Sequence, residues 1–487
     1  MFLNIFLVGT MCALIFHIHT HFAAVEPYMD EIFHIPQAQK YCRGDYYAWD
    51  PKITTFPGLY FYSSVAPVLQ RGAIRIFSED IFNSLISSDE LCSPNFLRLT
   101  VLLLAGVTPW ITARCRQTLF PAYEDGTFVS VMVFFFPFSF FYYFLYYTDT
   151  LSTVALILCY YISASNMEKS RTPGSNRVLI LLWQLLQLGS AVVAILARQT
   201  NAVWLLHIAG TYMLDYVEDK KYFRDVPLSE LSPGMLISFI TSLLKALPSL
   251  LLSTWPLLLP VLSFVVFVFG FNEGSIVVGD KDNHRMVLHA AMPLHLGMVI
   301  ALLLGPRDLL LGVLDLMSSA RKGLMSKSTT LIQKAKSTLF VVCVFAVVTL
   351  ILLWGCMSHP FLEADNRHLS FYIWRYVLSK PLMRLLLGPL YTVCLWVVVN
   401  RAAQSRGAVW LLIYMTAVCL TLLPAHLFEL RYFTPGAVIA LLNMPKVRKV
   451  SCGWSLITSC SISLTLLHIF LFKSFTWPDE SIARFML

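Results

Sequence analysis

Charged residues are scarce in this chain, since Asp, Glu, Lys and Arg make up only 13% of its 487 residues. A soluble domain usually carries about 25%, so the scarcity argues against an ordinary soluble protein. Apolar runs recur from one end of the sequence to the other, and a run of about twenty residues can cross a bilayer as a helix. The short alternating segments of a membrane β-barrel are missing. The sequence therefore predicts an all-α polytopic membrane protein.

Zinc-type cysteine patterns and internal repeats are also missing. The 11 cysteines form neither a CxxC pair nor a Cys/His spacing suited to zinc. Only Cys42 and Cys92 share the first large loop, where a disulfide and two free thiols are both open alternatives. The lack of an internal repeat weakens the case for an inverted-repeat transporter.

Thirteen apolar segments are predicted to cross the membrane. They cover residues 3–23, 97–113, 127–146, 149–165, 178–197, 201–216, 251–271, 286–304, 338–357, 383–400, 408–424, 433–445 and 454–473. Residues 232–250 are compatible with an interfacial helix or half of a hairpin, and residues 433–445 are short for a full crossing. We therefore expect about 12 to 14 transmembrane helices in one domain.

Lys and Arg gather in alternate gaps between these segments, as cytosolic loops do. They are Arg114, Arg116, Lys169, Arg171, Arg177, Lys220, Lys221, Arg224, Arg307, Arg321, Lys322, Lys327, Lys334, Lys336, Arg401, Arg406, Lys446, Arg448 and Lys449. The net charge of +8 is explained by these loops and is not a sign of nucleic-acid binding. The first loop, residues 24–96, is then predicted to be lumenal.

The loops on the predicted lumenal face carry an unusual concentration of acidic, basic and amide side chains. After the first loop they are "YTDT" (147–150), "ARQTN" (197–201), "NEGSIVVGDKDNHR" (272–285), "HPFLEADNRHLSFYIWR" (359–375) and "HLFELRY" (426–432). Polar residues from distant parts of the chain therefore collect on one side of the membrane. This pattern predicts a convergent polar site there.

The motif "MDEIFH" places two carboxylates, Asp30 and Glu31, just after the first apolar segment. One interpretation is a solvated helix start, because acidic residues favour helix N-termini. The other is a general base, which sugar transfer from a lipid phosphate requires; a glycosidase would need two flanking carboxylates. Adjacent side chains on a helix point in different directions. We therefore expect only one of the two to face a substrate, and leave open which one.

Several segments resemble one enzyme family in the order expected along the chain. They are "PYMDEIFHIPQAQKYC", "FFYYFLYYTDTLS", "LARQTNAVW", "GDKDNHRMVLH", "DNRHLSFYIWR" and "LRYF". They are similar to the endoplasmic-reticulum glucosyltransferases that use dolichyl-phosphate glucose to add the last, α-1,2-linked glucose to Glc2Man9GlcNAc2-PP-dolichol. The resemblance implies a multi-pass GT-C glycosyltransferase with a lumenal active site, in which Asp30, with Glu31 second, is the base. It implies no cofactor beyond the lipid-linked donor.

A departing dolichyl phosphate needs fixed cations near the membrane surface, and the arginine fork suits phosphate geometry. The candidates for this role are Arg367, His368, Arg375 and Arg431. The alternative is that arginines at helix ends extend toward lipid headgroups, an interpretation that applies with equal force to Arg375.

Other polar residues of the same loops are candidates for substrate binding. They are His34, Asp149, Arg198, Asp280, Asn283, Asp365 and Asn366. Asp149 is also placed where a helix N-cap would lie. The "GDKDNHR" stretch lacks the downstream Gly and Glu of a calcium loop, so we interpret it as a sugar-binding or solvated loop and predict no metal site.

A polytopic transporter and a non-enzymatic membrane regulator are the rival functions. A transporter is expected to bury charges within its spans near the midplane. Here the predicted spans are nearly free of charge apart from boundary residues such as Asp215. A regulator would not need the acidic first loop, and an activity assay would distinguish it from an enzyme.

Overall fold

The structure is a computed structural model, and it describes residues 14–65, 92–171, 177–325 and 331–487. Residues 14–23 are helical. The helices that follow in the first half are α2 (Glu31–Cys42), α3 (Gly58–Ser64), α6 (Pro94–Ala105), α7 (Thr108–Leu119), η1 (Pro121–Tyr123), α8 (Gly126–Phe134), α9 (Pro137–Phe140), η2 (Phe141–Phe144), α10 (Thr148–Arg171), α11 (Arg177–Ala197), α12 (Asn201–Asp219) and η3 (Leu228–Glu230).

The second half continues the same helical architecture. Its elements are α13 (Pro233–Phe271), α14 (Met292–Leu304), α15 (Pro306–Met325), α16 (Leu331–Gly355), α17 (Pro360–Ala364), α18 (Leu369–Ile373), the π-helix η4 (Trp374–Leu378), α19 (Pro381–Arg406), α20 (Ala408–Leu422), η5 (Leu430–Phe433), α21 (Thr434–Asn443) and α22 (Lys449–Phe472). Two short antiparallel strands, β1 (Phe475–Thr476) and β2 (Ile482–Ala483), form the one sheet of the described chain.

The prediction of an all-α polytopic membrane protein is confirmed. By length and composition, six helices of the described residues can cross a membrane, or eight if each of two bent pairs is one span. Residues 339–355 of α16 and all of α20 are shorter apolar helices. Fewer helices therefore qualify as full spans than the thirteen segments predicted. The predicted first segment, 3–23, lies partly outside the described residues.

Two of the predicted transmembrane segments are not single full-length helices in the structure, and in each case the cause lies within the segment. The segment predicted at 433–445 is α21, which has only 10 residues, about 15 Å of helix, and is buried throughout. The segment predicted at 127–146 is broken, because α8 and the α9–η2 pair meet at an angle of 55° just before Pro137. Proline removes a backbone donor and commonly ends or kinks a helix.

The uncertain stretch 232–250 belongs to a single long helix. Helix α13 runs through 39 residues and contains Pro248, Pro256 and Pro260. Its length is about 58 Å, which is longer than the hydrocarbon core of a bilayer. The hairpin interpretation of this stretch is therefore wrong.

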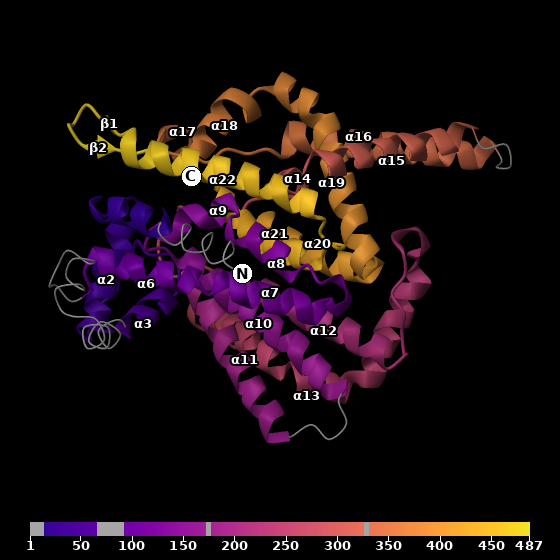
Figure 1. The fold of residues 1–487 in the computed structure, drawn as a ribbon, viewed down its shortest axis with the longest axis horizontal. Helices are drawn as coiled ribbons and strands as arrows, with labels where there is room; N and C mark the ends of the chain where they lie inside the picture. Colours follow the sequence, from indigo (N-terminus) through magenta and orange to yellow (C-terminus); the bar gives the residue numbers. More distant parts are fainter. Residues whose placement is uncertain (1–13, 66–91, 172–176, 326–330) are drawn as a thin grey trace, which may run out of the picture.

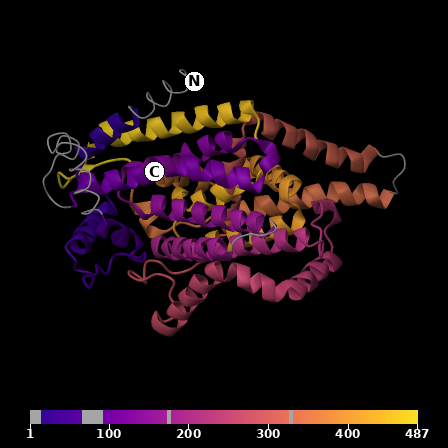
Figure 2. The same ribbon diagram turned by 60° about the horizontal axis from the view of Figure 1, so that its bottom comes forward.

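Figure 1 shows how the helices are arranged, with α2, α3 and α6 gathered at one end of the molecule. Helix α22 runs across the molecule, from the neighbourhood of α14 to the end where β1 and β2 lie. Helices α15 and α16 project together as a long pair, which is also clear from the second direction (Figure 2). Helix α14 turns sharply into α15, at 116°, where Gly305 has a φ of +96° that glycine adopts without strain.

Loops that were predicted to share one face meet at the end of the molecule that contains α2. The amide side chain of Gln199 donates to the carbonyl oxygen of Thr54 at 2.7 Å. The backbone N–H of Asp280 donates to the carbonyl oxygen of Pro51 at 3.1 Å. The loops after α11 and α13 are therefore attached to the first large loop.

Other helix ends carry their own ion pairs, of which Arg116–Asp125 is buried. Arg116 donates to Asp125 from Nε and Nη2, each at 2.8 Å, and Arg406 donates to Asp215 at 2.9 Å. Both pairs use arginines from the loops that were predicted to be basic. Arg116 and Arg406 thus hold neighbouring helices together through these ion pairs.

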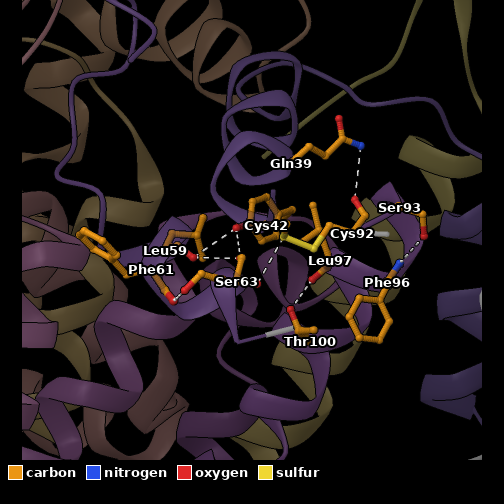
Figure 3. Close-up of a disulfide and its surroundings, with 12 residues drawn as sticks. Gln39, Cys42, Leu59, Phe61, Ser63, Cys92, Ser93, Phe96, Leu97 and Thr100 are labelled. Carbon is orange, nitrogen blue, oxygen red and sulfur yellow. Dashed lines mark hydrogen bonds between the residues drawn. A yellow bond between two sulfur atoms is a disulfide. The ribbon is translucent and has the colours of Figure 1, made fainter. Parts of the chain in front are cut away.

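Cys42 at the end of α2 and Cys92 just before α6 form a disulfide (Figure 3). The hydroxyl of Ser63 in α3 donates to the carbonyl oxygen of Leu59 at 2.9 Å in the same region. The disulfide settles the alternative that the sequence left open. The disulfide joins the end of α2 to the start of α6. It therefore holds the first part of the loop against the apolar span that begins at Pro94.

Candidate active site

Glu31 is buried at the start of α2 and is bound to Arg98 of α6. Arg98 donates to its two carboxylate oxygens at 2.9 and 2.6 Å, and neither side chain has accessible surface. The backbone N–H of Tyr146 also donates to Glu31, at 2.7 Å. Arg98 further donates to the carbonyl oxygens of Phe22 and Val25. Glu31 therefore joins three segments of the fold and offers no surface to a substrate.

Asp30 points into a different environment, where it meets Arg431. Nη1 and Nη2 of Arg431 both donate to Oδ2 of Asp30, each at 3.2 Å. Arg431 also donates to Glu429 and has Nη1 at 3.7 Å from Asp149, which is itself paired with Arg198. These five residues form what we call the acid–arginine cluster. It joins the first loop, the start of α10, the end of α11 and the segment before α21.

Accessibility distinguishes the members of the acid–arginine cluster. Asp30 keeps 43% of its side-chain surface exposed, whereas Asp149 keeps 6% and Arg431 keeps 14%. Both guanidinium contacts fall on Oδ2 of Asp30, and Oδ1 accepts no hydrogen bond from the described residues. Asp30 is therefore the acid of the cluster with a free oxygen and access to solvent.

The charge of Arg431 keeps Asp30 ionised. Burial is the largest influence and acts to raise the pKa of Asp30. The charge and hydrogen bonds of Arg431, together with the charges of His34 and His368, outweigh it and hold the pKa below its ordinary value of 3.8. The pKa of His34 is also lowered, below 6.5, because burial disfavours its charged form. At neutral pH the site thus combines an ionised carboxylate with an uncharged imidazole, whose Nδ1 lies 2.5 Å from the Tyr60 hydroxyl.

Aromatic side chains hold the cluster in place. The Asp30 backbone N–H donates to the Tyr147 hydroxyl at 3.1 Å. The Arg431 guanidinium lies 5.7 Å from the ring centre of Tyr142 and 5.5 Å from that of Tyr147. Such cation–π contacts favour a fixed position of the guanidinium. The aromatic run before α10 is thereby part of the site's wall, and its buried side chains pack in the core.

The segment that follows α17 supplies a second group of cations. Arg367 donates to Asp365 from Nε at 2.8 Å and from Nη2 at 2.7 Å, and His368 Nε2 lies 3.8 Å from Asp365. Burial acts to raise the pKa of Asp365, but the hydrogen bonds from Arg367 outweigh it and lower the pKa. His368 also contributes to the lowered pKa of Asp30. This segment therefore acts electrostatically on Asp30.

The structure does not bring Arg375, Asp280, Asn283 or Asn366 into the acid–arginine cluster. Arg375 lies exposed in η4, with its guanidinium near the rings of Phe371 and Tyr376. Asp280 accepts a hydrogen bond from Asn283 at 2.8 Å within its own loop. The exposed side chain of Asn366 takes part in no hydrogen bond within the described chain. These contacts favour the headgroup interpretation of Arg375.

The remaining predicted residues do come together at one place. Asp30, Asp149, Arg198 and Arg431 belong to the acid–arginine cluster, His34 flanks it, and Arg367, His368 and Asp365 lie on the neighbouring segment.

Residues that were not predicted from the sequence complete this arrangement. Arg98 stands within a predicted apolar span, where an ionisable residue is expected to have a buried partner. Glu429 lies two residues before Arg431, a spacing that puts side chains on one side of an extended chain. Both signals were available in the sequence. No pattern indicated Tyr28, whose hydroxyl contacts the far carboxy-terminal end of the chain.

Comparisons with known proteins agree on the family. Residues 24–442 match the DIE2/ALG10 family. The chain belongs to this family. Because the match begins before Asp30 and continues past Arg431, it contains the whole acid–arginine cluster of this DIE2/ALG10 protein.

Curated relatives of this DIE2/ALG10 protein carry one common name, Dol-P-Glc:Glc(2)Man(9)GlcNAc(2)-PP-Dol alpha-1,2-glucosyltransferase. The protein from Arabidopsis thaliana is 29% identical, with 95% of each chain covered. Those from Rattus norvegicus and Homo sapiens are 30% and 29% identical, with 95% of this chain and 93% of theirs covered. None of the solved structures matches the chain significantly.

Proposed function

We propose that this protein transfers glucose from dolichyl-phosphate glucose to the terminal glucose of Glc2Man9GlcNAc2-PP-dolichol, forming an α-1,2 bond. The relatives named for this reaction, aligned over 95% of the chain, support the choice of substrates. The observation that carries the chemistry is the accessible Asp30 carboxylate, held ionised by Arg431. A single ionised carboxylate is what a sugar transfer from phosphate requires of the protein.

The reaction is a single inverting displacement. The 2-hydroxyl oxygen of the acceptor glucose attacks C1 of the β-linked donor glucose as the bond from C1 to the phosphate oxygen breaks. Asp30 Oδ1 takes the hydroxyl proton, and dolichyl phosphate leaves with the bonding electron pair. The new bond is α because attack occurs opposite the leaving group. Proton removal by a positioned base contributes about 10²- to 10⁴-fold to such a rate.

The leaving phosphate needs positive charge nearby but no general acid, because phosphate is already a good leaving group. Arg367 and His368 are suited to this role, since His368 is close enough to Asp30 for its charge to affect the carboxylate. Arg367 is held in place by Asp365, which accepts hydrogen bonds from its Nε and Nη2. Arg431 is instead surrounded by carboxylates and serves mainly to set the charge state of Asp30.

We further propose that the enzyme is a multi-pass protein of the endoplasmic-reticulum membrane with its active site on the lumenal side and with no metal cofactor. The basic helix ends lie opposite the acid–arginine cluster, as the positive-inside tendency requires of a lumenal site. Within the described residues, no group of three or more His, Cys, Asp or Glu side chains is arranged to hold a metal. The positive charge for the phosphate would come instead from the Arg367 and His368 side chains.

The test is transfer by the purified full-length protein in lipid, with dolichyl-phosphate glucose and a diglucosylated lipid-linked acceptor. The expected product gains one hexose, α-1,2-linked, at a rate that a chelator does not change. Dolichyl-phosphate mannose and a monoglucosylated acceptor are the matched controls and should give little product. Equal use of either control would contradict the proposed substrates, and loss of activity with chelator would contradict the absence of a metal.

A further inference from the structure

The carboxy-terminal segment, residues 482–487, lies against the loop that carries Arg367 and His368. The backbone N–H of Met486 donates to the carbonyl oxygen of Arg367 at 2.6 Å, and the N–H of Leu369 donates to the carbonyl oxygen of Met486 at 2.8 Å. The two bonds are made by the residues immediately before and after His368, Arg367 and Leu369. The position of the candidate phosphate cations is therefore tied to the end of the chain.

The same segment is attached to the first loop through Tyr28, two residues before Asp30. The Tyr28 hydroxyl accepts from the Arg484 N–H at 2.8 Å and donates to the Arg484 carbonyl oxygen at 3.0 Å. One side chain thus satisfies both backbone groups of a residue more than 450 positions away. The Arg367 guanidinium lies 5.8 Å from the ring centre of Tyr28, so Tyr28 contacts both partners.

Burial and anchoring show that this segment is a built part of the site. Ala483, Met486 and Leu487 are buried, with 3 to 5% of their surface exposed. Arg484 Nη1 donates to the carbonyl oxygens of Phe470 and Leu471, which lie at the end of α22. Helix ends leave carbonyl groups unpaired, so these bonds fix the segment to a rigid element.

The segment also reaches the wall of the acid–arginine cluster. The Tyr142 hydroxyl donates to the Leu487 carbonyl oxygen at 3.4 Å, and the ring of the same tyrosine lies beneath the Arg431 guanidinium. The chain end therefore contacts the Asp30 side of the site through Tyr28 and Tyr142. It contacts the phosphate side through Arg367 and Leu369.

We propose that residues 482–487, held by Tyr28, are a positioning segment that sets the separation between Asp30 and the Arg367–His368 pair. The inference rests on the roles given to these residues in the proposed function. The acceptor hydroxyl and the donor phosphate lie on opposite sides of the reacting carbon, so the base and the cations must be held at matching places. Cations that are held in the wrong place bind the donor phosphate less well, so the loss should appear in the donor KM.

The test is Tyr28→Phe in the full-length protein, with Tyr62→Phe as the matched control. Tyr62 is a tyrosine of the same loop whose hydroxyl donates to the Thr100 carbonyl oxygen, away from the cluster. Tyr28→Phe removes two hydrogen bonds to Arg484 and should raise the donor KM about fivefold or more. The acceptor KM and the pH profile should stay unchanged, because Asp30 keeps its partner Arg431. Tyr62→Phe should leave the donor KM as in the wild type.

A second pair of variants tests the backbone bond from Met486. Met486→Pro removes the N–H that binds Arg367, whereas Met486→Leu keeps it along with an apolar side chain. The donor KM should rise only in Met486→Pro, while the melting temperatures of both are recorded. A uniform loss of active protein, with unchanged donor and acceptor KM in Tyr28→Phe and Met486→Pro, would show a merely structural role and overturn the inference.

The outcome for the wild type separates this inference from the proposed function. If wild-type protein does not transfer glucose from the donor, the proposed function fails and this inference fails with it. If the wild type and Tyr62→Phe are active and Tyr28→Phe has their donor KM, only the positioning role is overturned.

Discussion

Arg431 donates two hydrogen bonds to a single oxygen of Asp30, across 401 residues of sequence. The other carboxylate oxygen accepts no hydrogen bond from the part of the chain that the structure describes, and 43% of the side-chain surface is exposed. The ion pair therefore does two things at once. It keeps Asp30 charged, and it holds the free oxygen in a fixed orientation for a substrate hydroxyl.

The first prediction concerns the pH dependence that follows from this pair. The folded-state pKa of Asp30 lies below its ordinary value of 3.8, so the active, ionised form is present above that pH and is lost only as the pH falls through the lowered pKa. Arg431→Gln removes the charge that lowers it, and burial then raises the pKa. The acidic limb of the kcat/KM profile should move to higher pH, while Arg431→Lys should move it less. Superimposable acidic limbs in the wild type and Arg431→Gln would contradict the assignment.

The second prediction separates the structural acid from the catalytic one. Glu31→Gln leaves Arg98 buried without its charge partner, and breaking a buried ion pair costs about 3–5 kcal/mol. The melting temperature should fall, and a double variant, Glu31→Leu with Arg98→Met, should be more stable than Glu31→Gln alone. The fraction of Glu31→Gln that folds should keep most of its activity per folded molecule. A stable but inactive Glu31→Gln protein would assign the base to Glu31 instead.

The third prediction concerns the donor phosphate. Arg367→Ala removes a guanidinium beside the site, and a hydrogen bond between charged groups is worth about 1.5–3 kcal/mol. We expect kcat/KM for the donor to fall about 10- to 100-fold. Arg375→Ala removes an exposed cation whose guanidinium lies near aromatic rings of its own segment, and donor kinetics should stay near the wild type. Equal losses in the two variants would mean that only the general positive charge of this region matters.

The sequence predicted which loops meet at the site, because the patterns that place these loops are local in the sequence. Apolar runs and the side preference of Lys and Arg determine which loops share a face, and this was enough to bring Asp30, Asp149, Arg198 and Arg431 to one end. The all-α secondary structure and the multi-pass membrane class follow from the same patterns. A disulfide between Cys42 and Cys92 was compatible with the sequence but could not be decided there, because only the fold brings the two thiols together.

The rest depended on contacts between distant residues. Asp30 and Glu31 are indistinguishable by composition, and they differ because Arg98 and Arg431 lie on opposite sides of the start of α2. Fewer helices of the described residues than predicted are long and apolar enough to count as spans, because short apolar runs such as α21 are buried between other helices. The carboxy-terminal segment gave no sequence signal, since its role comes from backbone bonds to Arg367 and from Tyr28.

The central claim is that Asp30 is the general base, and the direct measurement is the glucose-transfer rate of Asp30→Asn at saturating donor and acceptor. Asparagine keeps the size of the side chain but cannot take the proton, so the rate should fall at least about 100-fold. The melting temperature should change little, because Arg431 keeps Glu429 and Asp149 as charge partners. A folded Asp30→Asn protein that transfers glucose at nearly the wild-type rate would contradict the account.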